Sequence, residues 1–176
     1  MSTQHVFDLT VSDVDRGVYE TRTLDVARHP SESLEYLVTR VLAFALELEE
    51  GLVFSRGLCV PDEPALWSRD LTGALRAWIE VGVPAAERLH KATKASPRVV
   101  VYAYKPGSLR ALDGARVHAP ERVTVVELDR ALISSIAERL ARRTRLAVSV
   151  TEGELYVDVE GASLSAPVRR GSLAPG

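Results

Sequence analysis

The first extended residues of the chain predict a β-hairpin. Val6, Leu9 and Val11 lie in a first extended run, a polar turn follows from Asp13 to Gly17, and a second extended run, YETRTLDVA, completes the pattern. Extended runs on either side of a polar turn are typical of two strands that pair with each other.

The strongest helical pattern follows in ESLEYLVTRVLAFALELEE, residues 32–50. Apolar residues recur there at the i, i+3, i+4, i+7 spacing of one buried helix face. They are Leu34, Leu37, Val38, Val41, Leu42, Ala45 and Leu48. Ser31 is expected to cap this helix and Gly51 to end it.

The centre of the chain alternates predicted strands and helices. DEPALW (62–67) and ALRAWIEV (74–81) predict two strands joined by a turn at Asp70 to Gly73. The other expected elements are a helix over 84–95, a strand at RVVVYAY (98–104) and a strand over 122–128. Because RVVVYAY is apolar throughout, it is typical of a strand covered on both faces in the middle of a sheet.

The C-terminal part predicts a helix, a hairpin and a disordered tail. Asp129 is expected to cap a helix that runs to Arg143, and RLAVSV and ELYVDV predict a hairpin about Glu152-Gly153. Residues 162–176 have little to bury and are expected to be disordered. The order of elements predicts an α/β or α+β fold in a single domain over 1–161, with one mixed sheet flanked by helices between the two hairpins.

Composition limits the functions that are open to the chain. Its 176 residues suit one domain, and a net charge of −2 gives no overall basic field for nucleic acid, although a local basic face stays open. Cys59, the single cysteine, permits no intramolecular disulfide and suits a reducing compartment. With no signal-like start and no apolar stretch long enough for a membrane span, a cytoplasmic protein is expected.

The candidate chemistry lies in carboxylates. The chain has no Gly-rich phosphate loop, no paired CxxC and no HExxH, and its four histidines have no metal-ligand spacing. Alternate strand residues share a face, so a register that aligns Trp67 with Trp78 would bring Glu63 and Glu80 to the same face. Two acids on adjacent strands suit Mg²⁺, which takes one or two carboxylates. The alternative is two solvated acids at strand edges.

A helical glutamate adds to this hypothesis. By helical phase, Glu35 lies at the border of the apolar stripe, whereas Glu32 falls on the far, solvated side. A border acid could reach a site between helix and sheet. The alternative is that Glu35 pairs with Arg40 or with water.

Four segments of the chain resemble the YaeQ family: VARHPSES, VFSRGLCVPDEPALW, AWIEVGVPAAERLHKA and VVVYAY. The resemblance extends over residues 11–159. It implies a restriction-endonuclease-like core of the PD-(D/E)XK superfamily, in which acids on two neighbouring strands hold Mg²⁺ beside a lysine and a helical glutamate. Glu63 (or Asp62) and Glu80 match the two acids, and Glu35 matches the helical position.

The chain departs from that superfamily pattern in two places. The second motif reads Glu80-Val81-Gly82 and lacks its lysine, and Ala65 stands where a nuclease has an aspartate. Arg88 or Lys91 on the following helix could replace the lysine. Helical phase places Arg88 near the border of the apolar side and turns Lys91 away from it.

Two functions are favoured by these residues, and an unrelated small-molecule role is the remaining alternative. The first is a nuclease-like fold that has lost its chemistry and binds nucleic acid or protein, which the missing lysine favours. The alternative is a Mg²⁺-dependent phosphodiesterase in which Glu63 and Glu80 hold the metal while Arg88 or Lys91 stabilises phosphate charge.

Overall fold

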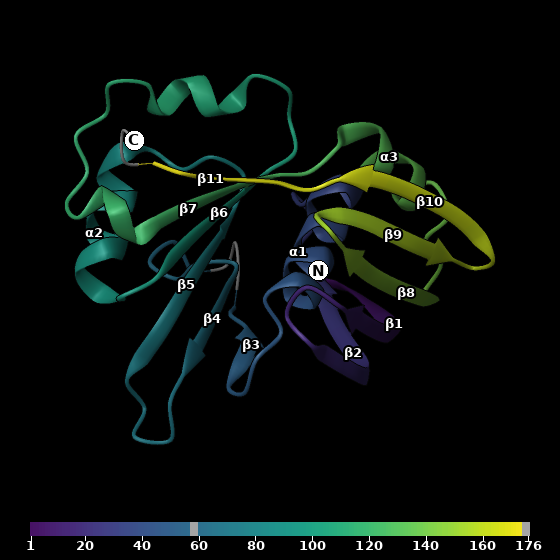
Figure 1. Ribbon diagram of the computed structural model, residues 1–176. Helices are drawn as coiled ribbons and strands as arrows, with labels where there is room; N and C mark the ends of the chain where they lie inside the picture. Colours follow the sequence, from purple (N-terminus) through teal and green to yellow (C-terminus); the bar gives the residue numbers. More distant parts are fainter. Residues whose placement is uncertain (57–59, 174–176) are drawn as a thin grey trace. The chain divides into compact units, whose positions relative to one another are not determined.

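The computed structural model describes residues 1–56 and 60–173, and the chain divides into two compact units. The first unit comprises Met1–Leu48 and Leu128–Val168, and the second comprises Glu49–Glu127 with the chain from Arg169 onward. Each unit has its own mixed sheet (Figure 1). The mixed α+β class is confirmed, but the single mixed sheet was wrong, because local patterns identify strands without saying which strands pair.

The sheet of the first unit is five-stranded, in the order β10-β9-β8-β1-β2. Its strands are β1 (Thr3–Asp13), β2 (Val18–Arg28), β8 (Arg143–Thr151), β9 (Glu154–Val159) and β10 (Ala162–Pro167). β1 pairs parallel with β8, and the other neighbours are antiparallel. Both predicted hairpins, β1–β2 and β8–β9, are confirmed.

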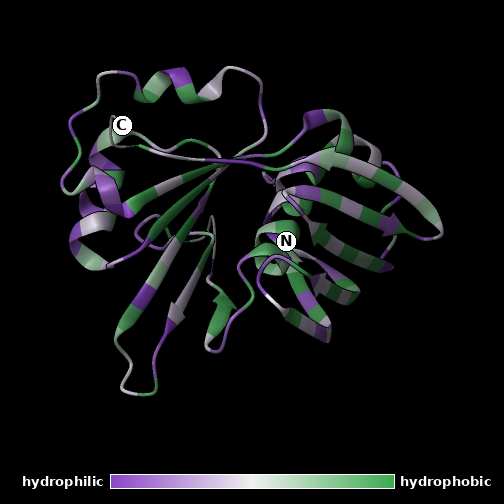
Figure 2. Ribbon diagram, viewed as in Figure 1, coloured by the Kyte–Doolittle hydropathy of each residue, from purple (hydrophilic) through white to green (hydrophobic). Residues whose placement is uncertain are grey.

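Two helices cover one face of this sheet. α1 (Leu34–Leu46) packs against α3 (Arg130–Ala137), and contacts join α1 to β1 and α3 to β10. The strands alternate accordingly: Phe7, Leu9 and Val11 of β1 are buried, and apolar and polar bands alternate along the strands (Figure 2). The first unit is therefore a helix layer on an amphipathic sheet.

The start of α1 differs from the prediction. Ser33, and not Ser31, caps the helix, because its side chain accepts a hydrogen bond from the Tyr36 N–H at 3.0 Å. Glu32 was expected on the solvated side but is 4% exposed. Since Glu32 precedes the first helical residue, helical phase does not describe where its side chain points.

The sheet of the second unit is six-stranded, in the order β11-β7-β6-β5-β4-β3. Its strands are β3 (Leu52–Phe54), β4 (Leu66–Arg69), β5 (Leu75–Val81), β6 (Val99–Ala103), β7 (Val123–Glu127) and β11 (Arg169–Ser172). β6 is buried along its whole length and pairs parallel with β5 and with β7. The prediction of a central, doubly covered strand is confirmed.

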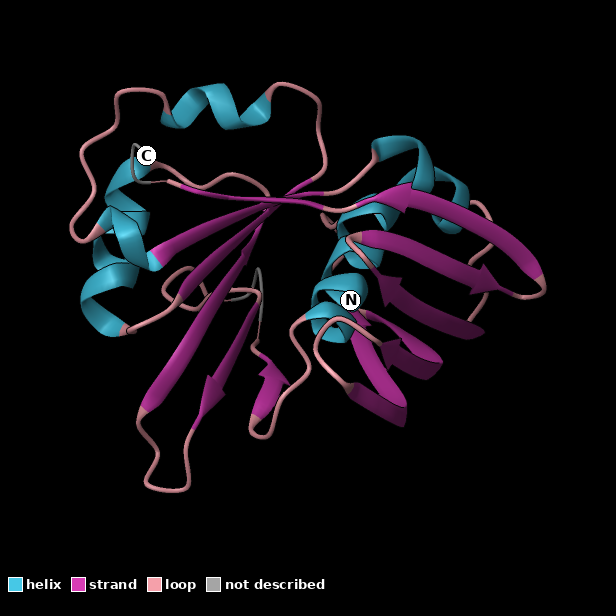
Figure 3. Ribbon diagram, viewed as in Figure 1, coloured by secondary structure: helices cyan, strands magenta, loops and turns pink. Residues whose placement is uncertain are grey.

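One face of the second sheet carries a hydrophobic core. α2 (Ala86–Ala95) supplies Leu89 and Ala92, and the 3-10 helix η2 (Ser108–Leu112) supplies Leu112. The strands contribute Trp78, Val99, Val101 and Val123. η2 lies in the long connection between β6 and β7, which also contains η3 (Pro120–Arg122) (Figure 3). This core fixes α2 and the connection on the sheet.

The C-terminal residues are ordered where disorder was expected. Residues 162–172 contribute β10, which pairs with β9, and β11, which pairs with β7. Both strands complete edges of sheets formed elsewhere in the chain, so their own composition does not reveal the pairing. The predicted C-terminal helix is also shorter, since α3 ends at Ala137 and Arg143 begins β8. No helix among the described residues is long and apolar enough to span a membrane.

Candidate functional site

The register of β4 and β5 aligns the two tryptophans, which is the condition that the two-acid hypothesis required. Trp67 pairs with Trp78, and their rings meet edge to face with centroids 6.3 Å apart. The guanidinium of Arg69 lies 4.8 Å from the centre of the Trp67 ring. Trp78 and Glu80 follow at alternate positions of β5, so the register fixes the sheet face from which Glu80 projects.

Glu63 does not lie on a strand. β4 begins at Leu66, and Glu63 belongs to the turn that precedes it. Pro64 separates the two, and a proline has no backbone N–H to donate to a neighbouring strand. Asp62, the alternative acid, is exposed in the same turn. The predicted strand at 62–67 is thus shorter than expected, and the first acid reaches the site from a loop.

Glu80 is buried and has two side-chain donors. Only 6% of the residue is exposed. Its Oε1 accepts a hydrogen bond from the indole N–H of Trp78 at 2.7 Å and another from Nε of Arg88 at 2.7 Å. An arginine is protonated throughout the physiological range, so Arg88 neutralises the charge of the Glu80 carboxylate.

Arg88 ties Glu80 to the turn that contains Glu63. Its Nη2 donates to the backbone oxygen of Glu63 at 2.6 Å, and its Nη1 donates to the backbone oxygen of Pro61. One guanidinium therefore contacts three oxygens from two segments of the chain. Its side chain is 32% exposed, in agreement with the border position predicted from helical phase.

The Glu63 carboxylate has a different arginine as its partner. Oε1 accepts from Nε and Nη2 of Arg56 at 3.1 and 2.6 Å, and Oε2 accepts from the Arg56 backbone N–H at 3.0 Å. The hydrogen bonds from the Arg56 side chain lower the pKa of Glu63; burial opposes this shift, and the backbone bond adds to it. The same pair raises the pKa of Arg56. Both candidate metal acids are therefore ion-paired.

The other two candidates take no part in these pairs. Lys91 is exposed on α2, while Leu89 and Ala92 of the same helix are buried, as helical phase predicted. Glu35 belongs to the first unit, where it accepts a hydrogen bond from the Ser134 hydroxyl at 2.8 Å and lies 3.4 Å from Nη2 of Arg130. Its partner is thus Arg130 and not Arg40.

The arrangement of possible metal ligands tests whether the predicted Mg²⁺ fits this site. In residues 1–56 and 60–173, no three His, Cys, Asp or Glu side chains lie together so that they could hold a metal ion. Mg²⁺ binds through one or two carboxylates and keeps several waters. An ion at Glu80 would have to displace Arg88, so the side chains as arranged do not fit it. Cys59, the single cysteine, lies outside the described residues.

Sequence reasoning missed two partners in this site. The indole of Trp78 donates to Glu80 two residues further along the same strand, which alternation along β5 could have suggested. The contact of Arg56 with Glu63 had no such signal. It spans a loop with no regular period, so spacing along the chain does not predict it.

The comparisons with known proteins agree with the sequence resemblance. The family model described as YaeQ protein matches residues 1–168. "Uncharacterized protein YaeQ" of Salmonella typhi is 30% identical over 154 residues, which are 85% of this chain and 84% of that protein. The Escherichia coli (strain K12) protein of the same name is 38% identical over 96 residues. These are 54% of this chain and 53% of that protein, so the match spans about half of the relative's length.

Solved structures of similar proteins share the fold. The crystal structure of YaeQ protein from Pseudomonas syringae has a TM-score of 0.87 at 35% identity, with 99% of this chain and 97% of that chain covered. The structure of YaeQ protein from Xanthomonas axonopodis pv. citri has a TM-score of 0.85 at 33% identity, with 96% and 97% covered. The likeness extends over both units.

Proposed function

The chain belongs to the YaeQ family. We propose that it is a binding module whose partner is a nucleic acid or a protein, and that the module itself carries out no phosphodiester chemistry. The observation that carries this proposal is the pairing of Glu80 with Arg88. A catalytic acid must be available to a metal or a proton, whereas this one is buried beneath a permanent cation. The pair acts as a tie between α2, β5 and the turn at 61–63.

Two further features support a site without chemistry. Val81 and Gly82 follow Glu80, so β5 has no lysine after its acid to stabilise a phosphate. Glu63 is likewise held by an arginine.

A restriction-endonuclease-like core is part of this proposal, and the parallel strands β5, β6 and β7 with α2 on one face support it. A fold can be kept while its chemistry is lost.

One observation favours the second candidate, a Mg²⁺-dependent phosphodiesterase. The guanidinium of Arg88 is surrounded by three oxygens, from Glu80, Glu63 and Pro61. Oxygen atoms from a carboxylate and from backbone carbonyls are ligands that hard divalent cations accept. If Arg88 swung out when substrate binds, an ion could take the place of its positive charge.

Calorimetric titration with MnCl₂ separates the two candidates. For a binding module we expect no site in the wild type and the same heats for Glu80→Gln. Arg88→Met then tests the oxygen cluster, since it removes the cation and leaves the oxygens in place. A wild-type manganese site that Glu80→Gln abolishes, together with manganese-dependent cleavage of a labelled oligonucleotide, would establish the phosphodiesterase instead.

A further inference from the structure

The small net charge of the chain hides a segregation of charge. The first unit has nine Lys and Arg against fourteen Asp and Glu, and the second has thirteen against ten, which gives −5 and +3. Within the second unit, residues 86–122 contain eight Lys and Arg and three Asp and Glu, a net charge of +5. The rest of the chain sums to −7. A local field can attract a charged partner even when the whole molecule is nearly neutral.

The outer face of α2 presents part of this charge. Leu89, Ala92 and Thr93 are buried on the inner face of the helix. Lys91 and Lys94 lie on the opposite arc and are exposed. The arrangement follows from 3.6 residues per turn, which separates the apolar and basic positions of the helix.

The connection between β6 and β7 extends the same surface. The His118 N–H donates to Nδ1 of His90 on α2 at 3.1 Å, and Nη1 of Arg122 donates to the Thr93 oxygen at 3.2 Å. These bonds hold the connection beside α2. The hydrophobic cluster beneath them contains residues from both elements, namely Leu89, Ala92, Leu109, Leu112 and Val117.

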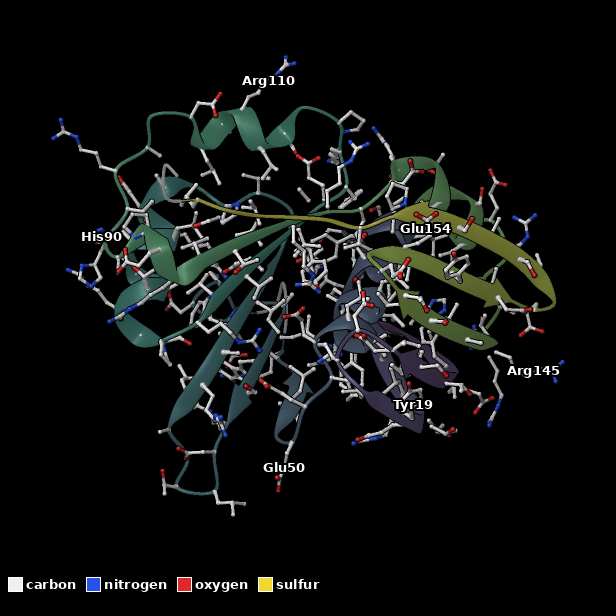
Figure 4. The ribbon with its side chains drawn as sticks, viewed as in Figure 1. Tyr19, Glu50, His90, Arg110, Arg145 and Glu154 are labelled. Atoms are coloured by element: carbon white, nitrogen blue, oxygen red, sulfur yellow. The ribbon has the colours of Figure 1, made fainter. Side chains whose placement is uncertain are left out.

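The arginines of the connection are directed outward. Arg110 of η2 and Arg116 are exposed, and Figure 4 shows Arg110 and His90 projecting from their elements. Among the residues that the structure describes, Lys91, Lys94, Arg110 and Arg116 form no ion pair. Arg88 and Arg98, by contrast, are engaged with Glu80 and Glu49.

We propose that Lys91, Lys94, Arg110, Arg116 and Arg122, here termed the cationic surface, bind the sugar–phosphate backbone of a nucleic acid. The proposal rests on the proposed function and names its partner. Several exposed cations on α2 and on the connection packed against it match a ligand with regularly repeated negative charge. The same segment, residues 86–122, includes the exposed acids Glu87, Asp113 and Glu121, which limit its net charge and hence the affinity.

The composition of the cationic surface also predicts the mode of binding. The two tyrosines of this segment, Tyr102 and Tyr104, are buried, so neither ring is open to base stacking, and the rings of His90 and His118 contact each other with centroids 5.9 Å apart. Binding through phosphates alone is independent of base sequence and strongly dependent on salt. With about four phosphates neutralised, log K should fall with log salt with a slope of about −3 to −4.

The test is fluorescence anisotropy with labelled single-stranded and duplex oligonucleotides of mixed sequence at several salt concentrations. Lys91→Glu/Lys94→Glu should weaken binding at least tenfold. The matched control is Arg139→Glu/Arg142→Glu, which makes the same change of net charge at two exposed arginines of the first unit. The control should change the affinity less than threefold, and an equal loss in both variants would overturn a localised surface.

Folding and partner class are tested in parallel. Circular dichroism checks each variant, and Arg110→Ala/Arg116→Ala repeats the test on the connection if the helix variant is unfolded. Polyglutamate of matched charge serves as a competitor: displacement of the oligonucleotide at equal charge concentration would indicate an acidic protein partner and overturn the inference.

The outcome also separates this inference from the proposed function. Absence of oligonucleotide binding, with no cleavage on a gel, would overturn the inference and leave a module that binds protein. Oligonucleotide binding that the Lys91→Glu/Lys94→Glu variant weakens, together with metal-dependent cleavage, would support binding at the cationic surface. It would overturn the proposal that the module carries out no chemistry.

Discussion

Each unit of the molecule contains a buried glutamate paired with an arginine eight residues later, and the two pairs differ in exposure. In the first unit, Nε of Arg40 lies 2.7 Å from Oε2 of Glu32, and the side chains are 5% and 2% exposed. In the second unit, Nε of Arg88 lies 2.7 Å from Oε1 of Glu80, but the arginine side chain is 32% exposed. The two pairs have the same distance and the same chemical groups, but they differ in how far solvent reaches the arginine.

The surrounding hydrogen bonds explain what each pair does. Arg40 also donates to the Ala27 oxygen at 2.9 Å, and Glu32 also accepts from the His29 N–H at 3.2 Å, so the first pair joins the end of β2 to α1. Arg88 joins β5 to the turn at 61–63, and 32% of its side chain is exposed. We call the fully buried pair Glu32–Arg40 closed and the partly exposed pair Glu80–Arg88 open. A closed pair can only stabilise the fold, whereas an open pair can also contact a ligand.

The largest effect is expected from Arg40→Met, which leaves the Glu32 carboxylate buried without its counter-charge. Breaking a buried ion pair from one side costs about 3–5 kcal/mol. Urea denaturation followed by circular dichroism measures the change in the free energy of unfolding. Arg139→Met, at an exposed position, is the control and should change it by less than about 0.5 kcal/mol. A loss under about 1 kcal/mol for Arg40→Met would mean that water reaches Glu32.

A smaller loss of stability, about 1–3 kcal/mol, is expected for Arg88→Met. Glu80 keeps its hydrogen bond from Trp78, and the partial exposure of the site lets water hydrate the carboxylate. The same denaturation experiment measures the difference between the two pairs. A loss as large as that of Arg40→Met would remove the distinction between a closed and an open pair.

Trp78→Phe should have a still smaller effect, about 1 kcal/mol beyond the packing change, because it removes one hydrogen bond to Glu80 and keeps the aromatic contact with Trp67. Combining Trp78→Phe with Arg88→Met completes a double-mutant cycle. We expect the double variant to lose more than the sum of the single losses, since Glu80 then has neither of its donors. Simple additivity would show that the two donors act independently.

The sequence was most informative where the physical signal is local. The hairpin turns, the apolar stripe of α1 and the apolar run of β6 follow from residues within a few positions of one another, and all three are found in the structure. The assignment of strands to two sheets was not predictable in this way. β10 and β11 are strands only because β9 and β7 offer them edges.

The candidate site shows the same limit. The border position of Arg88 could be derived from helical phase, whereas the Trp67–Trp78 register was only a condition of the hypothesis, since strand alternation does not say which residues pair. Glu32 and Glu63 were misplaced because neither lies in the regular element to which it was assigned. Their pairing with Arg40 and Arg56 depends on how the loops that contain the two glutamates pack, for which the sequence has no periodic signal.

The smallest effect is expected from the second ion pair of this site, in which the arginine, Arg56, is exposed and the Glu63 side chain is 10% exposed. The hydrogen bonds from Arg56 lower the pKa of Glu63 below its ordinary value of 4.5. A carboxylate with a lowered folded-state pKa stabilises the protein above its unfolded pKa, and this contribution is lost as pH falls through the folded value. Glu63→Gln should therefore show a shallower decline of the free energy of unfolding below about pH 4.5 than the wild type shows.

Glu121→Gln, at an exposed acid, is the control and should follow the wild-type curve, because no ion pair of Glu121 is present among the described residues. If both variants decline as steeply as the wild type, Arg56 is too exposed, at 72% of its side chain, to hold Glu63, and the acid would then be open to a cation.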